Sequence, residues 1–344
     1  MAIRVDGGLR LGAGHVARCL SLARGLAAAG AHVELLSSEL DEPLRRRVLT
    51  AGFGISDLPS SRARQREATC RSLSRTDVLV VDHYELGEED ERAFSSYVPR
   101  VVAFDDRPSR RHHTHVLVDT TLGRTESDYA GWVEPGTELL LGSRYALVAP
   151  EIGERREEAR IRRAEGEAKN LLICLGGACT PQTLERLTGG LVANAIHERF
   201  QIRLVGGMAL DEPTLARLRA QLGQDACLPG YVGNVPDLLL WADVAVGAAG
   251  VSTWERCTLG LPTVLLRLAD NQEQTARAVV SSGAALDGGG PDVDAKAIAE
   301  GLDRLQQDPE LYRETSDRAF QICDGGGVER TCTGVLGDPQ RSAT

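Results

Sequence analysis

Short apolar runs that end in an acidic residue or a glycine turn recur along the whole chain, with helical patterns between them. A run without polar alternation is typical of a parallel strand that is buried on both faces. A helix between two such runs favours a crossover connection and hence a parallel sheet. We therefore predict an α/β fold with strands at residues 2–5, 32–36, 77–81, 101–104, 116–118, 170–175, 201–205, 243–247 and 263–266.

The chain of 344 residues is longer than a single hydrophobic core usually supports, so two lobes are expected. Both halves show the strand-and-loop pattern of a Rossmann-like lobe, and we expect two parallel sheets that face each other across a cleft. A charged, helix-favouring stretch separates the halves, and a surface helix within one lobe is a compatible interpretation of it. The predicted divisions are a first lobe at 1–150, a connecting segment at 151–169, a second lobe at 170–310, and a C-terminal helix and tail at 311–344.

The charge balance and the cysteine pattern limit which binding partners and which cell compartment are expected for this chain. The formal net charge is −10, which gives no electrostatic reason to expect nucleic acid as a partner. No apolar run approaches about 20 residues, so we expect no membrane span. The eight cysteines show no zinc spacing, which favours buried thiols in a reducing compartment and no bound metal. With a strand-like start and no signal-peptide pattern, we predict a cytoplasmic protein without a cofactor or an obligate protein partner.

In open α/β sheets, ligands bind beyond the carboxyl ends of the strands, so the loops at those ends are the candidate sites. The first loop, residues 6–15, carries Gly12 and Gly14, which let the backbone turn tightly and approach a ligand. His15 falls near the start of the first helix, where the helix dipole favours the neutral imidazole that a general base needs. A helix-capping or filler histidine is the alternative. A dinucleotide loop is disfavoured, because Ala17 stands where that motif has its third glycine.

A loop of the second half follows a strand, opens a helix and carries Gly250, Ser252 and Glu255. Free backbone N–H groups at such a helix start suit a pyrophosphate, and the carboxylate of Glu255 suits two ribose hydroxyls. A capping box between Ser252 and Glu255 is the alternative. Gly176 and Gly177 form a second glycine turn of this kind.

Asn271 and Gln272 follow the last predicted strand of the second half. Their amides can both donate to and accept from sugar or phosphate groups. Helix capping by Asp270 or Asn271 is the alternative.

Two strand-end loops of the first half are also polar. One carries Asp82-His83-Tyr84 and the other carries Asp105-Asp106. Carboxylates at strand ends often cap the following helix, but two such loops that point at one cleft predict a wall that binds a sugar.

These motifs, taken in their order along the chain, resemble one family. The matching stretches are 4–7, 11–20, 82–84, 104–106, 176–177, 247–257, 260–262, 269–272 and 324–327, together with Arg330. They resemble the UDP-2,4-diacetamido-2,4,6-trideoxy-β-L-altropyranose hydrolases of pseudaminic acid biosynthesis, a group that includes spore-coat polysaccharide proteins. That group is in turn similar to GT-B glycosyltransferases, notably the lipid II-forming N-acetylglucosaminyltransferase.

The resemblance implies a metal-independent hydrolysis of a UDP-sugar. The residue that matches His15 would activate a water molecule for attack on the anomeric carbon, and C–O cleavage would release UDP and the free sugar with inversion. The residues that match Tyr84, Glu255 and Asn271 would contact the substrate and UDP. The first lobe would then serve the sugar and catalysis, and the second lobe the nucleotide. Cys179 stands where the family often has an aspartate after its glycine pair, which leaves the sugar and the base open.

The predicted site follows from the loops and from the resemblance together. We expect His15 as the catalytic base, substrate contacts from Asp6, Gly12, Gly14, Tyr84, Asp106, Asn271 and Gln272, and nucleotide contacts from Gly176, Gly177, Gly250, Ser252 and Glu255. The first alternative is a GT-B glycosyltransferase that excludes water and binds an acceptor alcohol. A non-catalytic nucleotide-sugar binding protein would leave His15 without a task, and a nicotinamide dehydrogenase is disfavoured by the incomplete glycine motif.

Overall fold

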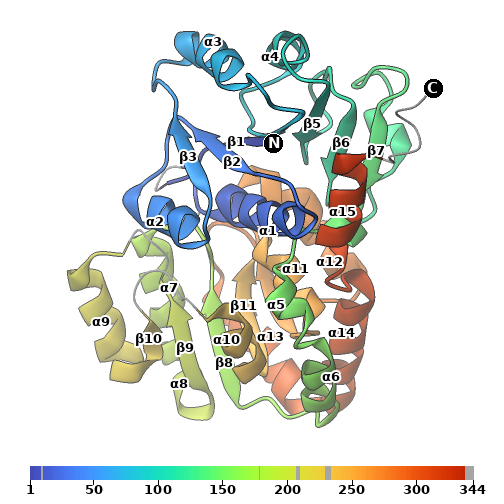
Figure 1. The fold of residues 1–344 in the computed structure, drawn as a ribbon. Helices are drawn as coiled ribbons and strands as arrows, with labels where there is room; N and C mark the ends of the chain where they lie inside the picture. The colour runs from blue at the N-terminus through green and yellow to red at the C-terminus, as the bar shows by residue number, and fades with distance from the viewer. Residues whose placement is uncertain (9–10, 178, 207–209, 229–233, 338–344) are drawn as a thin grey trace. The chain divides into compact units, whose positions relative to one another are not determined.

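The computed structural model describes residues 1–8, 11–177, 179–206, 210–228 and 234–337 (Figure 1). The chain divides into two compact units. The first unit is Met1–Leu147 together with the described residues from Gly326 onward, and the second unit is Val148–Gly325. The charged stretch 151–169 lies within the second unit, and the last described helix belongs with the first.

Within its described residues, the first unit holds one sheet of seven parallel strands in the order β3-β2-β1-β4-β5-β6-β7. The chain turns back at β1, so that β4 lies beside β1 on the side opposite β2. This reversal is the switch point at which open α/β sheets bind their ligands. The strands are β1 (Ala2–Val5), β2 (Glu34–Ser37), β3 (Gly54–Asp57), β4 (Val78–Asp82), β5 (Arg100–Phe104), β6 (Val116–Asp119) and β7 (Glu138–Leu141).

Helices cover this sheet, and one of them comes from the far end of the chain. The described helices of the unit are α1 (Gly14–Ala28), α2 (Glu42–Thr50), α3 (Arg62–Ser72), α4 (Glu88–Phe94), η1 (Glu126–Tyr129), η2 (Ser143–Tyr145) and α15 (Gly327–Leu336). Helix α15 packs on α1 at Gly25, where an added Cβ would lie 2.5 Å from Cγ1 of Val328 and 2.8 Å from Sγ of Cys332. The absent side chain of Gly25 is therefore what allows this close approach.

In the described part of the second unit, six parallel strands follow the order β10-β9-β8-β11-β12-β13. The order repeats that of the first unit, with the reversal now between β8 and β11. The strands are β8 (Asn170–Cys174), β9 (Gln201–Val205), β10 (Cys227–Leu228), β11 (Val244–Ala248), β12 (Thr263–Leu266) and β13 (Leu286–Asp287).

The helices of the second unit surround its sheet. They are α5 (Pro150–Gly153), α6 (Arg156–Ala164), α7 (Pro181–Ala193), α8 (Ile196–Arg199), α9 (Glu212–Leu222), η3 (Gln224–Ala226), α10 (Val235–Trp241), α11 (Ser252–Thr258), η4 (Asp270–Gln272), α12 (Glu273–Ser281), α13 (Ala295–Gln307) and α14 (Pro309–Ile322). Helix α6 is tied to the end of α14 because Arg156 donates to the carbonyl oxygens of Phe320 and Cys323, at 2.6 and 2.8 Å.

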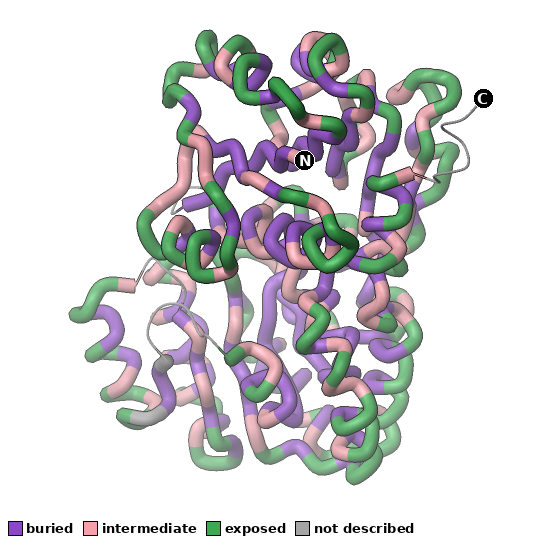
Figure 2. The backbone as a smooth tube through the Cα atoms, viewed as in Figure 1, coloured by how far each residue is buried: buried purple, intermediate pink, exposed green. Residues whose placement is uncertain are grey.

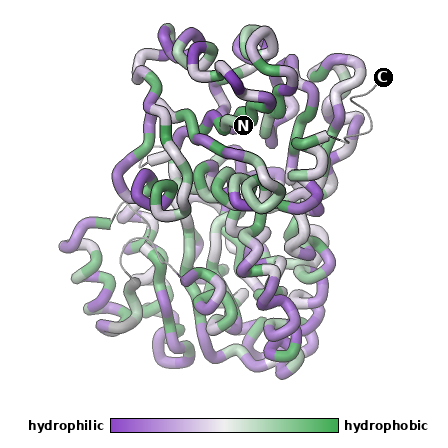
Figure 3. Tube along the Cα trace, viewed as in Figure 1, coloured by the Kyte–Doolittle hydropathy of each residue, from purple (hydrophilic) through white to green (hydrophobic). Residues whose placement is uncertain are grey.

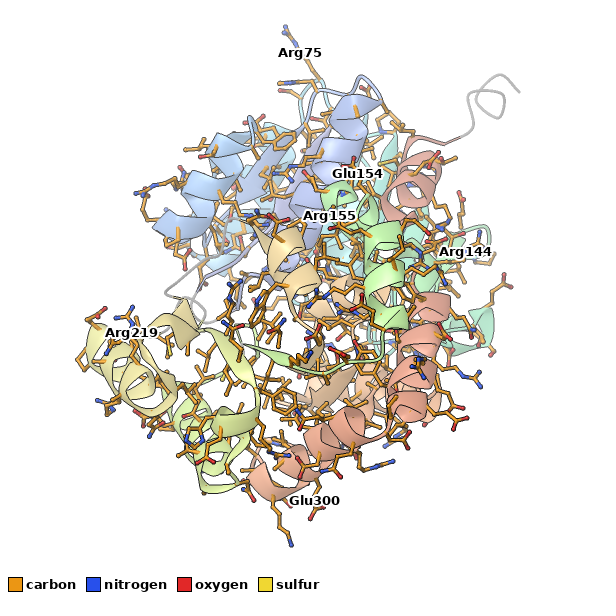
Figure 4. All side chains as sticks on the ribbon, turned by 90° about the horizontal axis from the view of Figure 1, so that it is seen from below. Arg75, Arg144, Glu154, Arg155, Arg219 and Glu300 are labelled. Atoms are coloured by element: carbon orange, nitrogen blue, oxygen red, sulfur yellow. The ribbon has the colours of Figure 1, made fainter. Side chains whose placement is uncertain are left out.

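Burial follows the strands in both units. The central strands are buried along almost their whole length (Figure 2) and coincide with hydrophobic segments (Figure 3). Exposed charged side chains such as Arg75 and Glu300 point away from the ribbon (Figure 4). Among the described residues, no helix combines the length and the apolar character that crossing a bilayer would require.

Candidate functional site

His15 and Asp82 meet at the switch point of the first sheet. His15 is the second residue of α1, which begins after the β1 loop, and Asp82 is the last residue of β4. Strands β1 and β4 are neighbours, with Val5 opposite Asp82, so the two loops share one edge of the sheet. Nδ1 of His15 lies 2.6 Å from Oδ1 of Asp82, and the His15 side chain keeps 18% of its surface exposed while that of Asp82 keeps none.

Arg18 determines the ionisation of Asp82. Its Nε and Nη2 donate to the two carboxylate oxygens at 2.7 and 2.5 Å. Burial raises the pKa of Asp82, but the charge of Arg18 and the hydrogen bonds from Arg18 and His15 outweigh burial and hold the pKa well below its usual range. The ionised carboxylate can only accept, so Nδ1 of His15 donates to it, and Nη2 of Arg18, which lies 3.1 Å from Nδ1, donates to Asp82 as well. When the imidazole is neutral, this arrangement leaves the lone pair that a general base uses on Nε2.

Tyr84 and Asp106 complete this group. The Tyr84 ring meets the His15 ring edge to face, with centroids 5.0 Å apart and planes at 88°. The Tyr84 hydroxyl donates to the Asp106 carboxylate, with oxygen–oxygen distances of 2.9 and 3.1 Å. Three of the residues predicted from the sequence thus lie together in one unit.

Gly12 and Gly14 shape the loop that leads to His15. Gly12 has φ of +78°, which a residue with a side chain rarely adopts, and it exchanges two backbone hydrogen bonds with Gly8. Residues 9 and 10 of this loop lie outside the described residues. Helix α1 starts at Gly14 with Ala13 at its N-cap, so His15 is not the capping residue, and its ring bonds Asp82 instead.

Asp6 takes a different place from the one that its position in the loop suggested. Its carboxylate accepts hydrogen bonds from Arg4 at 2.5 and 2.8 Å, from the Ser38 hydroxyl at 2.7 Å and from His83 at 3.1 Å. Burial raises the pKa of Asp6, but the hydrogen bonds from His83 and Arg4 outweigh burial and lower it. Asp6 therefore joins the ends of β1, β2 and β4, and binding a substrate would require it to exchange one of these partners.

Two further buried carboxylates stand at the ends of the next strands, and the sequence analysis did not pair either with a cation. Asp105 follows β5 and pairs with Nε of Arg110 at 3.2 Å, and Asp119 ends β6 and pairs with Arg124. In both cases the arginine follows its aspartate by five residues, and this spacing is a signal that could have revealed the pairs. Arg110 also donates to the carbonyl oxygen of Tyr84.

These arginines hold the loops that carry the candidate site. Arg110 reaches the carbonyl oxygen of His83 at 3.3 Å, and Arg124 reaches that of Asp106 at 3.0 Å. The backbones on either side of the Tyr84–Asp106 hydrogen bond are therefore fixed by ion-paired arginines.

In the second unit, the predicted nucleotide residues lie on neighbouring loops. Strands β8, β11 and β12 are adjacent, so the loops after them share one edge of the sheet. Gly176 has φ of +69° in the turn after β8. A Cβ added to Gly250 would lie 3.8 Å from Nε2 of Gln272, which places these two loops in contact. Gln272 is buried and accepts a hydrogen bond from the Leu268 N–H at 2.8 Å, whereas Asn271 is exposed.

The capping alternatives for these loops are wrong. Helix α11 has Val251 at its N-cap, so Ser252 lies inside the helix and cannot form the capping box with Glu255. The Ser252 hydroxyl instead accepts a hydrogen bond from Arg256 at 3.0 Å. The N-caps of η4 and α12 are Ala269 and Gln272 rather than Asp270 or Asn271, and neither N-cap side chain forms a capping hydrogen bond.

Arg256 is a buried residue of this loop that the sequence analysis missed. Its guanidinium lies against Gly247, where an added Cβ would be 2.6 Å from Cζ of Arg256. It donates to the carbonyl oxygen of Ala248 at 2.8 Å and to the Thr253 hydroxyl at 3.2 Å. Burial lowers the pKa of Arg256. Arg256 thus fixes the end of β11 to the start of α11 and holds the loop with Gly250 between them.

Comparison with known proteins relates the chain distantly to several sequences, while no protein-family model matches it. It is 23% identical over 271 residues to the uncharacterized protein MJ1062 of Methanocaldococcus jannaschii, which is 77% of this chain and 55% of that protein. It is 22% identical over 341 residues to the spore coat polysaccharide biosynthesis protein SpsG of Bacillus subtilis, and the match covers 98% of both chains. It is 26% identical over 176 residues to the UDP-2,4-diacetamido-2,4,6-trideoxy-β-L-altropyranose hydrolase of Campylobacter jejuni, which is 51% of this chain and 59% of that enzyme.

Solved structures match the chain over its whole length. MurG of Acinetobacter baumannii superposes with a TM-score of 0.66 and 15% identity, and 98% of each chain is covered. The glycosyltransferase WaaG superposes with a TM-score of 0.56 and 15% identity, over 98% of this chain and 100% of WaaG. This chain has the GT-B fold. The fold class predicted from the sequence is confirmed, and at such low identity the GT-B likeness establishes the fold alone.

The candidate sites of the two units consist of individual side chains and glycine turns. In the described part of the chain, no group of three or more His, Cys, Asp or Glu side chains is arranged to hold a metal ion. Histidines and carboxylates of the first unit are instead used in pairs with arginines or with each other.

His112 is the most deeply buried example of such pairing. Its Nδ1 lies 2.8 Å from Glu91, its Nε2 lies 2.8 Å from Asp105, and all three residues are buried. Burial by itself lowers the pKa of His112, but the hydrogen bonds to Asp105 and Glu91 outweigh burial and raise the pKa to about 9. An imidazolium between two carboxylates therefore ties α4 to the loop after β5, which carries Asp106.

This ion cluster predicts a loss of stability at alkaline pH. Because the pKa of His112 is higher in the folded than in the unfolded chain, its contribution is complete below about pH 6.5 and disappears as the pH rises through about 9. We expect wild type to lose on the order of 3 kcal/mol of unfolding free energy across this window relative to His112→Asn. Urea unfolding at several pH values measures the difference.

The neighbouring His113 provides the control, because it pairs with Glu134 near the surface. His113→Asn should keep the wild-type pH dependence. If His112→Asn and wild type lose stability in parallel from pH 6.5 to 10, the buried imidazolium is refuted.

Proposed function

We propose that the chain is an enzyme that acts on a UDP-sugar, and that it hydrolyses a UDP-linked deoxy-diacetamido sugar by C–O cleavage at the anomeric carbon. The product sugar would serve the biosynthesis of a nonulosonic acid of the pseudaminic type or of a surface polysaccharide. The observation that carries the proposal is the His15–Asp82 pair, in which an ionised buried carboxylate orients the imidazole through Nδ1. The distant relationships to the Campylobacter hydrolase and to SpsG support this choice of reaction.

In the proposed reaction, Nε2 of His15 accepts a proton from water as the water oxygen bonds to the anomeric carbon. The bond between that carbon and the β-phosphate oxygen breaks, and its electrons leave with UDP. Attack from the face opposite UDP inverts the anomeric carbon. Asp82 stabilises the imidazolium that forms, and Arg18 keeps Asp82 ionised throughout.

The remaining predicted residues divide between the two units. In the first unit we assign substrate contacts to Asp6, Gly12, Gly14, Tyr84 and Asp106. In the second unit we assign UDP to Gly176, Gly177, Gly250, Ser252 and Glu255, and further substrate contacts to Asn271 and Gln272. This division is supported by loops that follow adjacent strands in each sheet and by the glycine turns, whose backbone N–H groups can face phosphate oxygens.

Glycosyl transfer is the second candidate, because the chain shares the GT-B fold with the glycosyltransferase WaaG. The two reactions differ only in whether water or an alcohol attacks the anomeric carbon. We expect the chain to release UDP from a UDP-linked diacetamido sugar in EDTA without an acceptor, as measured by a coupled UDP assay. Release that depends strictly on an added acceptor would replace hydrolysis by transfer.

For the base, we expect His15→Ala and Asp82→Asn each to lower kcat by about 10²- to 10⁴-fold while substrate binding is retained, the usual size for a general base. Asp82→Asn acts by changing which ring nitrogen of His15 carries the proton. Single-turnover kinetics and calorimetric binding measure the two quantities. The exposed His32 supplies the control, and His32→Ala should match wild type. Turnover near the wild-type level in His15→Ala would remove the imidazole from the mechanism.

For the nucleotide, we expect Glu255→Gln to weaken UDP binding about 10-fold, because a neutral amide replaces a charged acceptor of ribose hydroxyls. Calorimetric titration with UDP measures the affinity, and thermal unfolding measures stability. Glu300→Gln changes an exposed carboxylate in the same unit and should affect neither. A lower melting temperature with unchanged UDP affinity would assign Glu255 to folding instead.

A further inference from the structure

Arg107 lies beside the candidate base, separated from it by one aromatic ring. It follows Asp106 in the loop after β5, and its Cζ lies 3.7 Å from the centroid of the Tyr84 ring. The same ring meets His15 edge to face, with centroids 5.0 Å apart. The Tyr84 ring therefore has both the candidate base and the guanidinium of Arg107 as neighbours.

Arg107 differs from the arginines around it in having no carboxylate. Arg18 pairs with Asp82, Arg110 pairs with Asp105 and Arg124 pairs with Asp119. No ion pair joins the exposed guanidinium of Arg107 to any carboxylate of the described residues. Its Cζ lies over the Tyr84 ring, and none of the five N–H donors of the guanidinium forms a hydrogen bond with a described residue. These donors remain available to a ligand.

The position of Arg107 is also fixed before a ligand binds. Its N–H donates to Oδ1 of Asp105 at 3.2 Å, and its carbonyl oxygen accepts from the Ser109 N–H at 2.7 Å. The Tyr84 ring under the guanidinium is held through its hydroxyl by Asp106. Because backbone and side chain are both restrained, binding a ligand orders little that is not ordered already.

We infer that Arg107 is a substrate-recognition residue whose guanidinium binds an anionic oxygen group of the ligand held next to His15. The group is either a phosphate of the nucleotide or a carboxylate on a sugar other than the diacetamido sugar proposed above, since a planar guanidinium forms paired hydrogen bonds with both. This inference rests on the proposed function for the identity of the ligand as a nucleotide sugar. It adds a cationic contact to predicted site residues whose side chains are an imidazole, a phenol, carboxylates, a hydroxyl and amides.

The test compares wild type, Arg107→Ala, Arg107→Lys and Arg64→Ala by calorimetric titration with three probes: UDP, UDP-N-acetylglucosamine and UDP-glucuronic acid. Arg64 is an exposed arginine of α3 that forms no ion pair with a described residue, so its variant should equal wild type. We expect Arg107→Ala to bind at least UDP-glucuronic acid about 10- to 100-fold more weakly, the size of a lost charge-assisted contact. Arg107→Lys keeps the positive charge but lacks the paired N–H donors of the guanidinium. Its affinity for the probe should therefore lie between those of wild type and Arg107→Ala.

The three probes distinguish a phosphate from a sugar carboxylate as the group that Arg107 binds. Equal weakening for all three probes assigns the contact to phosphate, and weakening for UDP-glucuronic acid alone assigns it to a sugar carboxylate. Equal affinities of wild type and Arg107→Ala for every probe, including no measurable binding by either, overturn the inference. Thermal unfolding should show Arg107→Ala within a few degrees of wild type, because the side chain is exposed.

Binding and turnover separate this inference from the proposed function. If Arg107→Ala weakens binding while wild type releases no UDP, hydrolysis fails and the recognition role stands. If wild type releases UDP and Arg107→Ala binds all three probes as wild type does, hydrolysis stands and the recognition role fails.

Discussion

The ion pair between Arg18 and Asp82 is the interaction on which the candidate site depends. A carboxylate buried at the end of β4 would be strongly destabilising without a cation, and Arg18 supplies one through two parallel hydrogen bonds. With Asp82 held as an anion, the hydrogen bond to His15 can have only one direction. The orientation of the imidazole and the proton on its Nδ1 both follow from that pair.

The same solution recurs along the first sheet. Asp105 and Asp119 are buried at the ends of the next two strands, and each pairs with the arginine that follows it by five residues. Parallel strands bring these carboxylates to one edge, where like charges would repel each other if they were left unpaired. Since the arginines also donate to loop carbonyl oxygens, each ion pair makes the neighbouring loop rigid. The loops with Tyr84 and Asp106 can therefore hold their side chains in place without regular secondary structure.

The second unit has the same strand order but different loop chemistry. Its candidate loops present glycines and amides rather than ion pairs, and Nη1 and Nη2 of its buried Arg256 donate to a backbone carbonyl oxygen and to hydroxyl oxygens. The close approach of Arg256 to Gly247 holds the start of α11 in place. One topology thus carries ion-paired side chains at the strand ends of the first unit and glycine turns at those of the second.

The sequence by itself determined the inner strands, because a parallel strand covered on both faces must be apolar throughout. It did not reveal β3, β7, β10 and β13, which lie at or next to the sheet edges, where short and partly exposed strands carry little hydrophobic pattern. It also pointed to His15, because a glycine loop between strand and helix is a local signal. Only the tertiary structure decided the partners of His15 and the start of α11. Asp82 is 67 residues from His15 and reaches it only because β4 returns beside β1. At α11, the local capping pattern of Ser252 and Glu255 gave way to Val251 at the N-cap, with Ser252 bonded to the buried Arg256.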